Sequence, residues 1–131
     1  MGFPTANLDA SEIKGADNGV YCSRAVVDGK IYGAMSNLGC RPSVDGQSRL
    51  LETHIFDFHG DIYGKMIEVR LLSKIRDEKR FDSIEELRRQ LEHDADMCRT
   101  ALADGAPKRE KFANMIRRAC STIYPRGKQR M

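Results

Sequence analysis

Two neutral oxygen-bearing side chains near the start of the chain could hold a metal ion. Thr5 and Asn7 follow Pro4, whose ring fixes the backbone in front of them. Residues two apart in an extended segment point the same way, so both side chains could face one ion. Neutral oxygens suit Mg²⁺, which keeps several waters and takes its charge partners from phosphate. Pro-Thr-Ala-Asn is also an ordinary turn sequence, and the segment alone leaves both interpretations open.

A single carboxylate on a largely apolar segment is the candidate for acid–base chemistry. Glu52 lies within Leu51–Phe58, where strand alternation would put it on the same face as His54. A carboxylate at the mouth of an apolar pocket has a raised pKa and can act as a general base. The alternative is an exposed glutamate at a strand end. His54 and His59 are interpreted as packed or surface histidines rather than as metal ligands.

A charged segment with one aromatic residue could bind phosphate and a flat ring. Every residue from Arg76 to Arg80 is charged, both signs are present, and Phe81 follows them. Arginine and lysine in a mobile loop can clamp a phosphate, and Phe81 could stack on a planar group. The alternative is a solvated loop, which mixed charges usually indicate.

The first half of the chain has the pattern of short strands joined by tight turns. Asp28-Gly29 is a hairpin turn signal, and Gly39–Gln47 has the composition of a loop. The predicted strands cover residues 19–28, 31–38, 49–58 and 65–75. This arrangement favours an antiparallel barrel or sandwich over residues 1–76.

The second half changes to helical periodicity. Ser83 and Glu86 form a capping-box pattern, and the helix that follows should end at Asp104-Gly105. A second helix is predicted from Pro107 to Ile123, followed by a polar tail over residues 124–131. Strands first and helices last make the chain mainly β with C-terminal helices, an α+β protein.

Length and composition limit the class of protein. With 131 residues, of which 40% are apolar, the chain fits one domain with one core. The net charge of +3 gives little support for a nucleic-acid partner, and neither common phosphate loop is present. The chain has no membrane-spanning apolar run, no signal segment and no Cys-x-x-Cys pair. We therefore expect a cytoplasmic protein with four reduced thiols and no membrane partner.

Several segments at matched spacing together resemble the riboflavin kinase (flavokinase) family. They are Gly2–Asn7, Gly19–Tyr21, Ser36–Gly39 with Arg41–Pro42, Leu51–Phe58, Asp61–Gly64 and Ile75–Ser83. The resemblance covers residues 2 to about 96, and the residues from about Met97 onward have no counterpart.

The resemblance implies a fold and a reaction. The fold would be a six-stranded antiparallel barrel, Greek-key-like, with a C-terminal helix. The reaction would transfer the γ-phosphate of ATP to the 5′-hydroxyl of riboflavin, giving FMN and ADP with the help of Mg²⁺.

The resemblance also implies residue roles. It gives the catalytic base to Glu52 and Mg²⁺ ligation to Thr5 and Asn7, which also bind the nucleotide. Further nucleotide contacts would come from Pro4, Ile55, Asp57 and Tyr63. Flavin contacts would come from Arg76, Lys79 and Phe81.

One departure from the family concerns the start of the chain. The family usually has a strand and a loop rich in glycine and arginine before the Gly-Phe-Pro-Thr-Ala-Asn segment, whereas Met1 directly precedes it here. The barrel is therefore expected to lack its first strand and to have an unpaired edge, and activity would depend on that missing segment. Since the sequence also contains no adenylyltransferase domain, we expect no FAD synthesis.

Two alternatives to a kinase stay open. One is a flavin-binding module that has lost catalysis. The other is an oligonucleotide-binding barrel, which the low aromatic content of 7% and the lack of tryptophan disfavour.

Overall fold

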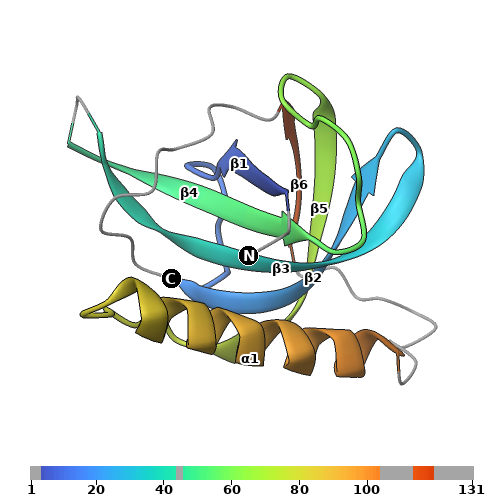
Figure 1. Ribbon diagram of the computed structural model, residues 1–131. Coiled ribbons are helices and arrows are strands. Elements are labelled where there is room, and N and C mark those ends of the chain that lie inside the picture. Colours follow the sequence, from blue (N-terminus) through green and yellow to red (C-terminus); the bar gives the residue numbers. More distant parts are fainter. Residues whose placement is uncertain (1–3, 44–45, 104–113, 120–131) are drawn as a thin grey trace.

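The computed structural model describes residues 4–43, 46–103 and 114–119. These residues form one curled antiparallel sheet with a single long helix against its outer face (Figure 1). The elements are β1 (Thr5–Asp9), β2 (Gly19–Val27), β3 (Lys30–Ser43), β4 (Gly46–Ile55), β5 (Met66–Arg76), α1 (Ile84–Ala103) and β6 (Asn114–Ala119). The mainly β, antiparallel fold with a C-terminal helix that the sequence predicted is confirmed.

The strands follow the order β1-β4-β3-β2-β5-β6 across the sheet. The sheet curls until its two edge strands, β1 and β6, come into contact (Figure 1). No hydrogen-bonded ladder joins β1 to β6 in the described part of the chain, so the barrel is open along this seam.

The tight turn between β2 and β3 has the predicted geometry. Asp28 has φ 51° and Gly29 has φ 79°, the two positive angles that a two-residue hairpin of this type requires. The predicted loop at Gly39–Gln47 is wrong for most of its length. There β3 and β4 continue as a paired hairpin, with Cys40 opposite Arg49 and Arg41 opposite Ser48. Composition suggested a loop, but the ladder satisfies the backbone groups of these residues directly.

The second predicted helix, residues 107–123, is wrong where the structure describes it. Residues Asn114–Ala119 form β6, which pairs with β5 in the register Ile116 opposite Val69. Without β6, one side of β5 would present a row of unpaired backbone groups, and pairing satisfies them whatever the local helical periodicity. The rest of that prediction and the polar tail at 124–131 lie outside the described residues.

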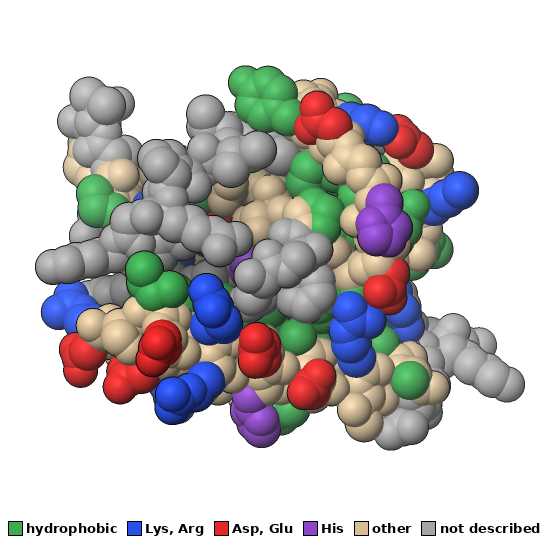
Figure 2. Space-filling model, viewed as in Figure 1, with side chains coloured by type: hydrophobic (Ala, Val, Ile, Leu, Met, Phe, Trp, Pro, Cys, Tyr) green, Lys and Arg blue, Asp and Glu red, His purple; other side chains and the backbone are tan. Residues whose placement is uncertain are grey.

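The first turn of α1 confirms the predicted cap. The Ser83 hydroxyl accepts a hydrogen bond from the backbone N–H of Glu86 at 3.1 Å. Acidic and basic side chains are intermixed along the exposed side of this helix (Figure 2). In the described part of the chain no helix combines the length and apolar character needed to cross a membrane.

Two apolar clusters lie on opposite faces of the sheet. The inner cluster fills the curl of the sheet and includes Leu38, Leu51 and Ile55. The outer cluster lies under α1 and joins Met35 and Phe56 to helix residues. Strand alternation therefore sends Leu51, Thr53 and Ile55 inward and leaves the two residues between them on the helix-bearing face.

Three hydroxyl groups are buried in the inner face of the sheet. Ser36 is hydrogen-bonded to both Ser23 and Thr53, each at 2.8 Å, and all three are fully buried. Cys22, Cys40 and Cys98 are free thiols, as predicted, and Cys120 lies outside the described residues.

Candidate active site

The sheet register brings the predicted metal residue and the predicted base side by side. Glu52 on β4 lies opposite Asn7 on β1 and, on its other side, opposite Asn37 on β3. Residues paired across neighbouring antiparallel strands share a face. Asn7, Glu52 and Asn37 thus form a polar row on the helix-bearing face, and all three are buried.

The next pair along β1 and β4 continues the site. Thr5 lies opposite His54, and the Thr5 hydroxyl is hydrogen-bonded to His54 Nδ1 at 3.0 Å. Both predicted metal residues therefore point to the same side of the sheet as Glu52, as alternation required. His54 is buried and packed, as the sequence suggested.

Glu52 is held by an arginine that sequence reasoning did not assign to the site. Arg41 Nε donates to Glu52 Oε1 at 3.0 Å, and Arg41 Nη2 lies 2.8 Å from the same oxygen. Burial raises the pKa of Glu52, the Arg41 guanidinium lowers it in part, and the nearby Glu78 raises it again. A carboxylate whose pKa is raised in this way is a stronger proton acceptor than an exposed glutamate, and it can still ionise beside its arginine.

The donor set around Glu52 fits a magnesium ion that arrives with a nucleotide. Thr5 and Asn7 offer neutral oxygens beside one carboxylate, and the described residues contain no group of three or more His, Cys, Asp or Glu side chains that could hold a metal. Mg²⁺ commonly binds through one or two protein groups together with waters and phosphate oxygens. Thr5 and Asn7 are therefore suitable partial ligands.

Three of the residues predicted to contact the nucleotide, Pro4, Ile55 and Asp57, lie where β1 begins and β4 ends. The backbone N–H of Ile55 donates to the carbonyl of Pro4 at 3.0 Å, while the Ile55 side chain is fully buried in the inner cluster. The Ile55 side chain is therefore not placed to contact a ligand, and its N–H is used by Pro4. Asp57 follows with φ 57° and pairs with Arg99 of α1 at 3.1 Å. Tyr63, in the connection to β5, is 60% exposed.

The residues predicted to contact the flavin lie at the far end of the polar row. Val20 on β2 pairs with Asn37 on one side and with Arg76 on the other. Arg76 is held by the buried Asp94 of α1, with Nε 2.9 Å and Nη2 2.7 Å from Asp94 Oδ2. Its guanidinium also lies 5.9 Å from the centre of the Phe81 ring. Lys79 is exposed.

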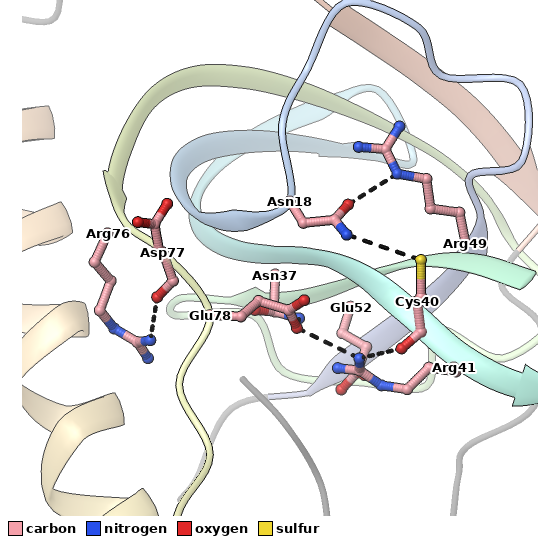
Figure 3. Close-up of polar contacts among 9 residues, drawn as sticks. All are labelled: Asn18, Asn37, Cys40, Arg41, Arg49, Glu52, Arg76, Asp77 and Glu78. Atoms are coloured by element: carbon pink, nitrogen blue, oxygen red, sulfur yellow. Dashed lines mark hydrogen bonds and ion pairs between the residues drawn. The ribbon is translucent and has the colours of Figure 1, made fainter. Parts of the chain in front are cut away.

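The loop between β5 and α1 reaches back into the site through Glu78. Asn37 Nδ2 donates to Glu78 Oε2 at 3.1 Å, and Arg41 Nη1 lies 3.4 Å from the same oxygen. Figure 3 shows Glu78 extending from the loop to the Arg41 guanidinium beside Glu52. Arg41 therefore lies between two carboxylates that come from different parts of the chain.

Sequence reasoning missed Asn37, Arg41, Glu78 and Asp94 as site residues. Asn37 and Arg41 lie in segments that carried the family resemblance, which was the available signal. No local pattern connects Glu78 to Arg41 or Asp94 to Arg76, because each pair meets only through the fold.

Most of the chain is similar to known proteins. A family model described as "Flavokinase: Riboflavin kinase" matches residues 1–102. The RNA-binding riboflavin kinase RibR of Bacillus subtilis is 47% identical over 95 residues, which are 72% of this chain and 41% of that protein. The bifunctional riboflavin kinase/FMN adenylyltransferase of Haemophilus influenzae is 39% identical over 100 residues, which are 76% of this chain and 32% of that protein.

A solved structure is also similar. The structure of a protein from Streptococcus pneumoniae called a macrolide-efflux protein matches with a TM-score of 0.67 and 36% identity, over 75% of this chain and 33% of that one. The chain thus spans less than half the length of each of these relatives.

Proposed function

Because this chain belongs to the riboflavin kinase (flavokinase) family, we propose that it transfers the γ-phosphate of ATP to the 5′-hydroxyl of riboflavin. The products are FMN and ADP. The observation that carries the proposal is the row of Asn7 and Glu52, a neutral oxygen donor beside a buried carboxylate of raised pKa. A kinase acting on an alcohol needs both a place for magnesium-bound phosphate and a proton acceptor for the attacking hydroxyl.

Glu52 acts as the general base in this reaction. As the riboflavin 5′-oxygen forms its bond to the γ-phosphorus and the bond from phosphorus to the leaving oxygen of ADP breaks, the hydroxyl proton passes to Glu52. Arg41 keeps the carboxylate in one position through its two contacts. Thr5 and Asn7 would hold Mg²⁺, which when bound neutralises phosphate charge.

The two substrates approach the row from its two ends. ATP lies toward Pro4, the Ile55 backbone, Asp57 and Tyr63, and riboflavin lies toward Arg76, Lys79 and Phe81. This orientation is supported by the contact between Pro4 and Ile55, where β1 begins and β4 ends, and by the register that puts Arg76 at the other end of the row. Phosphoryl transfer depends mainly on positioning and charge, and the rigid sheet supplies the positioning.

Replacing the base is the direct test. Glu52→Gln should lower turnover by roughly 10²- to 10⁴-fold, the usual contribution of a general base, while riboflavin and ATP affinities change little. FMN formation is measured by chromatography, and riboflavin binding by quenching of its fluorescence. Glu92→Gln, which neutralises an exposed carboxylate on α1, is the matched control and should retain parental turnover. Parental turnover in Glu52→Gln would remove Glu52 from the mechanism.

The same measurements separate the two alternatives. A flavin-binding module without catalysis would quench riboflavin fluorescence and form no FMN. An oligonucleotide-binding barrel would bind single-stranded RNA and leave flavin fluorescence unchanged. RibR is named as RNA-binding, but the mixed charges along α1 in this chain do not concentrate positive charge for such a partner (Figure 2).

A further inference from the structure

The Glu78 carboxylate lies in a small cradle built from three residues of β3. Asn37 donates to it at 3.1 Å, and Arg41 lies 3.4 Å from it. Gly39, between them, forms the floor of this cradle, because a Cβ at that position would overlap both oxygens of the carboxylate. An oxyanion site requires hydrogen-bond donors, positive charge and room for the anion close to the backbone. The Asn37 amide, the Arg41 guanidinium and Gly39 supply these three.

The distances around Arg41 show that it binds Glu78 more weakly than it binds Glu52. Glu52 receives two contacts from Arg41, at 3.0 and 2.8 Å, whereas Glu78 receives one at 3.4 Å. The two carboxylates also repel each other across a single guanidinium. Glu78 can therefore leave while Arg41 keeps its hold on Glu52.

A second observation points to a ligand at the same place. Asn37 is fully buried, and within the described part of the chain its Oδ1 atom accepts no hydrogen bond. A buried acceptor without a partner costs free energy, and a hydroxyl donor from a ligand would remove that cost. Asn37 thus offers its amide N–H to an anion and its carbonyl oxygen to a hydroxyl.

We propose that Asn37, Gly39 and Arg41 form a binding site for a phosphoryl group of the substrate or product, and that the loop carboxylate of Glu78 competes for it. The inference rests on the proposed function, which supplies phosphorylated ligands next to Glu52. It assigns to these residues a role in binding that is separate from proton transfer. Two sources share this chemistry, the phosphate of FMN and the phosphates of the nucleotide.

Removing the competitor should strengthen binding of the phosphorylated ligands alone. In Glu78→Ala the site is vacated, so the dissociation constant of FMN, of ADP with Mg²⁺, or of both should fall roughly tenfold, as expected when an internal competitor fills most of the sites. Glu78→Gln, which keeps the shape and removes the charge, should show a smaller change in the same direction. Riboflavin, which has no phosphate, should bind all variants equally. Glu92→Gln again controls for the lost charge.

Gly39→Ala provides the opposite test. A methyl group at this position fills the cradle, so affinity for FMN or ADP should fall while riboflavin affinity stays at the parental value. Isothermal titration measures ADP, and fluorescence titration measures FMN and riboflavin. Tightening of FMN alone assigns the site to the flavin phosphate, and tightening of ADP alone assigns it to the nucleotide.

The outcomes separate this inference from the proposed reaction. If riboflavin is bound and phosphorylated but Glu78→Ala binds FMN and ADP no better than Glu92→Gln does, the anion site is wrong and the kinase stands. If the parent forms no FMN but Glu78→Ala still binds a phosphorylated ligand more tightly, the site stands and the reaction is wrong. Failure of FMN and ADP to bind any variant would overturn the site.

Discussion

At the scale of residues, the site depends on one guanidinium that serves two carboxylates. Arg41 contacts Glu52, the proposed base, and Glu78, the proposed competitor. A base needs a raised pKa and must also ionise, and burial and Arg41 act on the Glu52 pKa in these opposite directions. The balance between them leaves a buried glutamate able to accept a proton. The effect of Arg41 could not be read from the segment Leu51–Phe58 alone.

The proposed magnesium role of Asn7 can be tested at the same scale. Asn7→Leu keeps the branched shape of this buried side chain and deletes its oxygen. We expect the Mg²⁺ concentration for half-maximal activity to rise roughly 10- to 100-fold, the usual cost of disturbing a metal site. Riboflavin affinity should stay unchanged, which also controls for the fold. Equal Mg²⁺ dependence in variant and parent would mean that Pro4–Asn7 has only a structural role.

At the scale of elements, the ion pair between Arg76 and Asp94 joins α1 to the end of β5. The side chains are 11% and 2% exposed, so the pair is largely buried. Removing one partner of such a pair leaves the other charge buried without compensation.

Asp94→Asn should therefore lower the free energy of unfolding by about 3 kcal/mol. Asp96→Asn, on the exposed side of the same helix, is the matched control and should change it by less than about 0.5 kcal/mol. Urea unfolding at neutral pH measures both variants. Equal midpoints for the two would show that α1 is held by its apolar contacts and that the ion pair adds little.

The elements also show which parts of the structure could be predicted from sequence. Alternation in β4 correctly placed Glu52 and His54 on one face of the sheet, and Ser83 marked the start of α1, because these signals are local. The loop expected at Gly39–Gln47 and the helix expected at Pro107–Ile123 were wrong over the described residues. Strand pairing decided both, in the hairpin of β3 with β4 and in the long-range pairing of β6 with β5. The same reason hides Glu78 from sequence reasoning, since its partners are about 40 residues away.

At the scale of the whole molecule, β6 closes most of the gap that the family resemblance predicted. The sequence suggested an unpaired edge, and in the structure the free side of β5 pairs with a strand from the C-terminal part of the chain. Only the seam between β1 and β6 lacks a ladder within the described residues. The barrel therefore gains its sixth strand from a segment beyond the residues that the family model matches.

Ending the chain after Ala103 tests the contribution of β6. Alternate amides of β5 should then exchange with solvent faster, because they lose their partners, while the amides that face β2 keep their protection. The exposed edge should also promote self-association that increases with concentration. Hydrogen exchange by NMR and light scattering measure the two effects. Unchanged protection across β5 would mean that β6 does not pair stably in solution.

The polar row across β1, β4 and β3 sets the distances of the site in fixed steps. Neighbouring strands lie about 4.8 Å apart, and side chains on one face recur about every 6.8 Å along a strand. The distance between Asn7 and Glu52 is therefore fixed by the pairing of β1 with β4, and a small shift of the backbone cannot change it. Substitutions that keep the reaction must therefore change side-chain length or the loops. A shift in the register of β1 against β4 would move Thr5 and Asn7 away from Glu52 by a full residue spacing. Insertions between Ser43 and Gly46, the last pair of β3 with β4, should leave these distances unchanged.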